Sequence, residues 1–244
     1  ADDCALLSPD REGLQRMLNI CKEYFDQHKI TISTNIILKK SKTKCMIFGS
    51  KLEPANIKLN DGRILPFVES WPHLGFELNK DESPDHDLMK KRGQFIGKLY
   101  ALRQQFANID PIVHTKLVSI YLTSFYGSPL WDLSSEAAMR LYSSWNIMMK
   151  IAYDIPRESK TFLIEPISET SHVKQKLLKR FLKFHKTLGE SDKPHVNYLR
   201  NIQQNDSRSI FGKNVKHIIQ ELGVDCIELA NINNCLLYTS DAAD

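Results

Sequence analysis

The sequence predicts an α+β fold in which a small antiparallel sheet, with a helix on one face, is followed by helices alone. Short apolar segments separated by turn residues recur up to about residue 80. A helical pattern interrupts them early, near residues 10–28. After Asp81 the strand signals stop and helical periodicity takes over. This order, with strands and helices in separate parts of the chain, is typical of α+β proteins.

The first elements are a strand and a helix. The apolar run 4–7 predicts a buried strand. Ser8-Pro9 follows as a helix N-cap with Pro at the first helical position. The helix extends to about His28, because apolar residues recur at helical spacing along one stripe: Leu14, Leu18, Cys21 and Phe25.

The remaining strands come from the next fifty residues. Asp61-Gly62 separates two of them and is a hairpin turn signal. Gly49 closes another. The predicted strands are 30–33, 44–48, 57–60, 64–68 and 73–78.

The second part of the chain predicts helices. Three amphipathic segments are separated by Asn108–Pro111 and Gly127–Pro129, and cover 85–106, 111–126 and 134–153. A basic helix follows, with apolar residues on one side: Val173, Leu177, Leu178, Phe181, Leu182 and His185. From Gly189 to Asn234 the chain is polar, and we expect loosely packed helix there.

Composition excludes several classes of protein. The chain of 244 residues is 42% hydrophobic and 25% charged, which is globular. No apolar stretch approaches the roughly 20 residues that span a bilayer, so no membrane partner is expected. The five cysteines lack close spacing and predict free thiols in a reducing compartment.

Positive charge is concentrated in two places, although the formal net charge is only +4. Four lysines lie between Lys39 and Lys44. Six basic residues without an acid lie between His172 and Lys186. Such patches suit a polyanion, and the alternative is a solvated face.

Two adjacent carboxylates, Asp2 and Asp3, precede the first apolar run. Neighbouring side chains of a strand point to opposite faces, so the two converge only where the chain turns. Carboxylate oxygens are ligands for magnesium, and two-metal sites drive phosphoryl transfer. The pair therefore predicts a metal site. The alternative is a chance pair, with Asp3 only capping a turn.

Taken in order, these pieces resemble the C-terminal palm and the thumb of a reverse transcriptase of non-LTR (LINE-type) retrotransposons. Ala1-Asp2-Asp3 resembles the end of the family's aromatic-Ala-Asp-Asp motif. Other similar segments are Leu6–Ser8 with the following helix, Lys39–Gly49, Trp71–Gly75 and Phe125–Trp131, and counterparts exist for Trp145-Asn146, Pro156-Arg157 and Asp206–Ser209. Trp-Pro-His before Leu74-Gly75 departs from the usual Tyr-Leu-Gly-like pattern.

The resemblance implies a domain order and a set of sites. Residues 1–80 are the C-terminal part of the palm, 81–190 a helical thumb and 191–234 a C-terminal extension. Asp2 and Asp3 hold Mg²⁺, and Lys42 or Lys44 neutralises the leaving pyrophosphate. His73, Leu74 and Gly75 form the primer grip. The expected nucleic-acid contacts are Lys174, Lys176, Lys179, Arg180, Lys183 and Lys186.

The implied activity is RNA-directed DNA polymerase. Its partners are an RNA template, a DNA primer or target and dNTP, in the nucleus and cytoplasm. The family's third carboxylate lies upstream, so we expect a fragment that is inactive alone. The tail 235–244 resembles the translation of a sequencing adaptor. Alternatives are a nucleic-acid-binding remnant without catalysis, and a decayed element copy.

Overall fold

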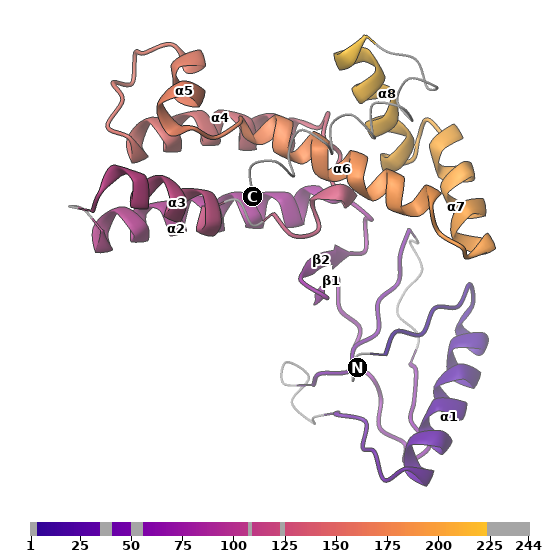
Figure 1. Ribbon diagram of the computed structural model, residues 1–244. Coiled ribbons are helices and arrows are strands. Elements are labelled where there is room, and N and C mark those ends of the chain that lie inside the picture. Colours follow the sequence, from indigo (N-terminus) through magenta and orange to yellow (C-terminus); the bar gives the residue numbers. More distant parts are fainter. Residues whose placement is uncertain (1–3, 35–40, 50–55, 107–108, 123–124, 224–244) are drawn as a thin grey trace. The chain divides into compact units, whose positions relative to one another are not determined.

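The computed structural model describes residues 4–34, 41–49, 56–106, 109–122 and 125–223. Its fold is mixed α+β and mostly helical, with one small antiparallel sheet among these residues. The chain divides into two compact units (Figure 1). A mixed unit comprises Ala1–His73 and Glu77–Ser83, and a helical unit comprises Leu74–Phe76 and Pro84–Asp244.

The mixed unit contains helix α1 (Arg11–Gln27). The helix begins two residues later than expected, because Asp10 rather than Ser8 is the N-cap. The Asp10 carboxylate accepts a hydrogen bond from the Gly13 amide at 2.6 Å, which satisfies a first-turn donor. The predicted apolar stripe faces the small core, since Leu18 is buried there and Leu14 packs beside it.

Most of the predicted strands are wrong. The run 4–7 is not a strand, and Leu7 is 78% exposed. Segments 44–48, 57–60 and 64–68 contribute only isolated bridges, Cys45 with Phe67 and Lys58 with Ile64, and no strand or bridge is assigned within 30–33. A physical reason lies at Pro66, which has no amide hydrogen to extend a ladder. The Asp61-Gly62 turn is present, with Leu65 donating to the Ile57 carbonyl at 2.9 Å.

The regular sheet is a hairpin of β1 (Ser70–His73) and β2 (Phe76–Asn79). The single strand expected over 73–78 is therefore wrong, because the chain reverses at Leu74-Gly75. Both turn residues have positive φ, 48° for Leu74 and 79° for Gly75. Two such residues form the type of turn whose twist matches antiparallel strands.

The helical unit is built from α2 (Asp85–Gln105), α3 (Pro111–Leu122), α4 (Glu136–Ala152), α5 (Ile164–Ser168), α6 (Val173–Gly189), α7 (Pro194–Asn205) and α8 (Ile210–Leu222), with short 3₁₀ turns η2 (Ser128–Leu130) and η3 (Thr161–Leu163). The three helices predicted over 85–106, 111–126 and 134–153 are present as α2, α3 and α4, and the basic helix as α6. Helix α3 ends earlier than expected, at Leu122.

Helix α2 packs against α3 and α4, and α6 packs against η2, α4 and α7 (Figure 1). The core between them combines aliphatic side chains with several aromatic rings. The Phe95 and Trp145 rings stack at 5.3 Å between centroids. Trp131 and Trp145 are fully buried, which confirms core packing as the expected role of both.

Helix α8 contradicts the expectation of loose packing after Gly189. Its Val215 and Ile218 belong to the same core as the tryptophans, and Ser209 caps its first turn through the Gly212 amide at 2.9 Å. No helix in the described part of the chain is both long and apolar enough to cross a bilayer.

Candidate nucleic-acid interface

The tip of the β1–β2 hairpin carries two of the three predicted primer-grip residues. Leu74 is 62% exposed, although its positive φ is uncommon for a residue with a branched side chain. Gly75 follows it, and His73, at the end of β1, is half-buried. Leu74 and Gly75 form the turn between the two hydrogen-bonded strands β1 and β2.

The hairpin tip is joined to residues 126–127 by a double-glycine contact. A Cβ at Gly75 would lie 3.1 Å from Cδ1 of Tyr126. A Cβ at Gly127, whose φ is 83°, would lie 2.9 Å from Cδ2 of Phe76. Each glycine therefore accommodates the ring of an aromatic residue beside the other glycine. Two sequence motifs about fifty residues apart, Trp71–Gly75 and Phe125–Trp131, meet at this contact.

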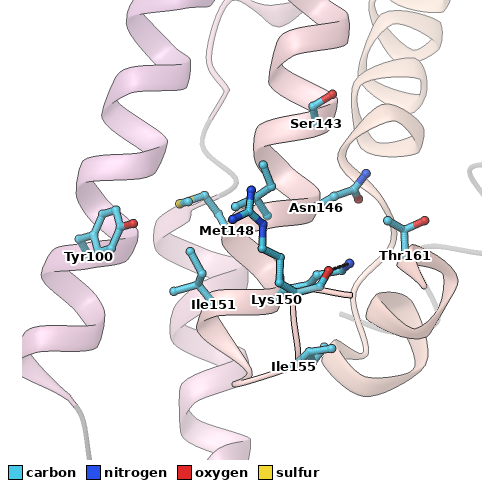
Figure 2. Close-up of a pocket in the computed structure, with 10 residues that line it drawn as sticks. Tyr100, Ser143, Asn146, Met148, Lys150, Ile151, Ile155 and Thr161 are labelled. Carbon is cyan, nitrogen blue, oxygen red and sulfur yellow. Dashed lines mark hydrogen bonds between the residues drawn. The ribbon is translucent and has the colours of Figure 1, made fainter. Parts of the chain in front are cut away.

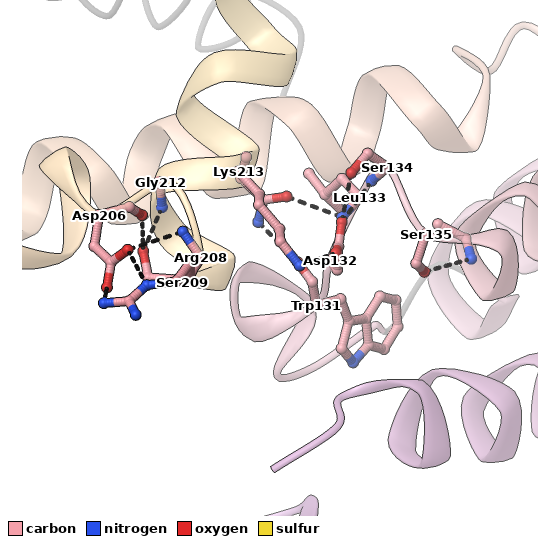
Figure 3. Close-up of polar contacts among 12 residues, drawn as sticks. Trp131, Asp132, Leu133, Ser134, Ser135, Asp206, Arg208, Ser209, Gly212 and Lys213 are labelled. Carbon is pink, nitrogen blue, oxygen red and sulfur yellow. Dashed lines mark hydrogen bonds and ion pairs between the residues drawn. The ribbon is translucent and has the colours of Figure 1, made fainter. Parts of the chain in front are cut away.

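The segment after Gly127 is fixed by buried polar groups. The Trp131 indole donates to Oδ2 of Asp87 in α2 at 2.8 Å. Asn214 of α8 makes two further bonds, donating to the Trp131 carbonyl at 2.7 Å and accepting from the Leu133 amide at 2.9 Å. Figure 3 shows this turn, with Lys213 beside Asp132. Helices α2 and α8 thus hold the turn that follows Tyr126 and Gly127.

The six predicted nucleic-acid contacts all lie on helix α6 and fall into two groups. Residues 176, 179, 183 and 186 recur at spacings of three and four and share one side of the helix. We call them the lysine row. Lys179 and Lys183 are exposed, and Lys176 and Lys186 are partly so. The row is about 15 Å long at 1.5 Å per residue.

The other two cations lie off this row. Lys174 Nζ forms an ion pair with Oε2 of Glu221 in α8 at 2.6 Å. Arg180 is half-buried, and desolvation lowers the pKa of its guanidinium. Within the row, Lys186 Nζ also lies 3.7 Å from Oε1 of Glu190. The exposed Lys179 and Lys183 are therefore the part of α6 best placed for a ligand.

Lys176 belongs to the lysine row but is partly buried against the core. Its ammonium lies 5.5 Å from the centroid of the buried Trp145 ring, a cation–π contact. Burial, with a smaller effect of nearby Arg180, lowers its pKa to about 8. The charge of Lys176 therefore responds to mildly alkaline pH.

Two histidines form polar contacts near the ends of α6, His172 at its start and His185 in its last turns. His172 caps the helix, since its Nδ1 accepts from the Lys174 amide at 3.1 Å while Nε2 lies 3.0 Å from Oδ1 of Asn146. At the other end, Nε2 of buried His185 lies 3.3 Å from Nη2 of Arg200. Burial lowers the pKa of both histidines, and the Arg200 charge adds to the effect at His185.

The predicted catalytic residues are only partly described. Asp2 and Asp3 lie outside the described residues, as do Lys39 and Lys40. Lys42 is exposed, and Lys44 is half-buried with its ammonium 5.3 Å from the Trp71 ring centroid. Within the described ranges, no three His, Cys, Asp or Glu side chains gather to hold a metal ion.

An open cleft of about 540 Å³ lies along α4 (Figure 2). Lys150 donates hydrogen bonds to the carbonyls of Arg157, at 2.8 Å, and Ser159, so its ammonium holds the 157–159 segment in place. The cleft was not expected from sequence. Its lining is largely apolar: Tyr100, Ser143, Asn146, Ile147, Met148, Lys150, Ile151, Ile155, Arg157 and Thr161.

Sequence reasoning missed the buried polar anchors Asp87 and Asn214 and the role of Tyr126. The glycine directly after Tyr126 was the available signal, because a Tyr-Gly step between two helical patterns marks a turn. Asp87 and Asn214 carry no such signal, since each lies inside an amphipathic helix. Comparisons with protein-family models, curated proteins and solved structures found no match.

Proposed function

We propose that this chain carries the C-terminal palm and the thumb of a reverse transcriptase of non-LTR retrotransposon type. The observation that supports this most is the double-glycine contact, which joins the primer-grip-like hairpin tip to the thumb-like segment Phe125–Trp131. Mixed α+β structure before residue 84 and helices after it are compatible with a palm followed by a thumb.

In this proposal the residues keep the roles that the resemblance implies. Asp2 and Asp3 hold Mg²⁺, which supplies charge neutralisation for a triphosphate when bound. Lys42 or Lys44 acts on the leaving pyrophosphate. His73, Leu74 and Gly75 support a primer terminus, and the lysine row of α6 binds phosphates of the template–primer duplex.

The first test is binding of a labelled RNA–DNA hybrid, followed by fluorescence anisotropy at several salt concentrations. We expect binding that weakens as salt rises, because lysine–phosphate contacts release counterions. The double reversal Lys179→Glu with Lys183→Glu should weaken binding and reduce the salt slope by about 1.5–2.

The matched control is Lys98→Glu with Lys116→Glu, two exposed lysines of α2 and α3 that change the net charge by the same amount. If both double variants lose affinity equally, binding depends on net charge alone and the lysine row is not the interface. If the unaltered chain binds no hybrid at low salt, the proposed function is wrong.

Polymerase chemistry needs its own test. We expect no primer extension with Mg²⁺ and dNTPs from these 244 residues alone, because no third carboxylate is assigned within them. Sequencing the source DNA upstream of Ala1 tests the proposal directly. An aromatic codon next to Ala1, and a strand bearing another Asp further upstream, support it. An unrelated upstream sequence leaves the second candidate, a nucleic-acid-binding module without catalysis, which the lysine row alone favours.

A further inference from the structure

We propose that Tyr126 is a stacking platform for a nucleobase, presented at the hairpin tip by the double-glycine contact. The inference rests on the proposed nucleic-acid function and adds a residue to it. The expected ligand is an unpaired or terminal base of a DNA or RNA strand, recognised by the π-face of the tyrosine ring.

The exposure of Tyr126 contrasts with that of its neighbours. Its ring is 62% exposed, whereas Phe125 is 2% exposed and Ser128 is fully buried. Phe125 serves the core, where its ring meets Phe95 and Trp131. Core packing therefore explains Phe125 and leaves the exposure of Tyr126 unexplained. A flat, amphipathic ring of this kind gives a large contact area at low entropic cost.

The Tyr126 ring is also held in place. One part of it lies against the backbone of Gly75, close enough that a Cβ there would be 3.1–3.3 Å from two ring carbons. Gly127 follows it in a conformation that a side chain rarely adopts. A ring fixed before the ligand arrives loses little rotamer freedom on binding, which favours affinity.

Charge in the same unit supports a nucleic-acid partner. Residues 128–130 (η2) directly follow the Tyr126-Gly127 step, and helix α6 packs against η2. That helix carries the lysine row. Single-strand binding sites combine basic residues that follow the backbone with aromatic rings that stack on bases, and the helical unit carries one feature of each kind.

The test uses the full chain and a single-stranded oligonucleotide that contains 2-aminopurine, whose fluorescence is quenched on stacking. Affinity is measured in parallel by anisotropy. We expect Tyr126→Ala to weaken binding by about 5- to 150-fold, equivalent to about 1–3 kcal/mol for one stacked base. The quenching on binding should disappear. Tyr126→Phe, which keeps the ring, should bind within about threefold of the unaltered chain.

The matched controls are Tyr121→Ala in α3 and Tyr198→Ala in α7, which remove rings that are 58% and 67% exposed. We expect both to keep affinity and quenching. Circular dichroism checks that every variant folds, and Phe at position 126 distinguishes loss of the ring from loss of the fold.

Two results with the variants would overturn the inference. One is Tyr126→Ala binding as tightly as the controls. Another is Tyr126→Phe losing as much affinity as Tyr126→Ala, since a hydroxyl contact would then be responsible. If the unaltered chain binds the RNA–DNA hybrid but position 126 has no effect, this inference fails and the proposed function stands. If the unaltered chain binds neither nucleic acid, both fail.

Discussion

The helical unit and the mixed unit satisfy their backbone polar groups in different ways. Helices α2, α4 and α6 form hydrogen bonds within themselves, and their side chains meet in a core with two buried tryptophans. The extended segments of the mixed unit need neighbours for their amides. Beyond the short β1–β2 hairpin, the described residues of this unit form two isolated bridges and scattered backbone hydrogen bonds, around a core of five buried side chains. We infer that the helical unit is the more stable of the two.

The largest expected effect is at Trp145. Replacing it with Ala removes a fully buried ring between Phe95 and Lys176, and should cost about 3–5 kcal/mol of unfolding free energy. Trp71→Ala is the counterpart in the mixed unit, where the ring is only half-buried. Chemical denaturation followed by circular dichroism measures both. Equal losses would contradict the comparison between the units.

The next largest effect is at Asn214. Its replacement by Ala leaves the Trp131 carbonyl and the Leu133 amide without their partner, and each such group costs about 1–3 kcal/mol when buried. We expect a loss of roughly 2–6 kcal/mol in thermal or urea unfolding. The control is Asn201→Ala, an exposed asparagine of α7, which should change stability by less than about 0.5 kcal/mol.

Gly127 and Gly62 provide a matched pair with the same φ of 83°. Alanine at either position incurs the left-handed backbone penalty of about 1–2 kcal/mol. Only at Gly127 does the new Cβ meet a side chain, that of Phe76 at 2.9 Å. Gly127→Ala should therefore cost about 1–3 kcal/mol more than Gly62→Ala in denaturant unfolding. Equal costs would show that Phe76 moves aside freely.

The smallest expected effect is a pH dependence of the helical unit. The pKa values of His114, His172 and His185 are lowered below 6.5, mainly by burial. Below pH 6.5 the unfolded chain therefore binds more protons than the folded chain, so stability is fully present above that pH and decreases as pH falls. Unfolding measured between pH 7 and pH 5 tests this.

His172→Ser is the diagnostic variant for the pH effect. Serine retains an N-cap oxygen for the Lys174 amide but does not titrate in this range. The variant should show a shallower decrease of stability with falling pH. An unchanged slope would assign the effect to other groups.

Sequence alone predicted the helices well because their pattern is local. Helix α2 begins at the predicted residue and ends one residue early, at Gln105. The start of α1 was missed because Asp10 competes successfully with Ser8 for the cap. Strands were overpredicted because an apolar run does not reveal whether a neighbour will pair with it.

The candidate interface was predicted only in pieces. The hairpin residues and the basic helix were predicted as sites, and that prediction stays untested; the contact between Gly75 and Tyr126 was not predicted. That contact depends on two turns meeting across about fifty residues, which no local spacing encodes. The separation of Lys174 from the lysine row likewise depends on Glu221 of a later helix.

The Asn214 bridge has a consequence for how this protein can be divided. One amide side chain near the end of the described chain satisfies both backbone groups that flank Asp132, about eighty residues earlier. Helix α8, the last helix of the described residues, is thus part of the support of the 131–133 turn. A chain shortened before residue 210 would expose that turn to water and to proteases, so expression boundaries belong after Leu222.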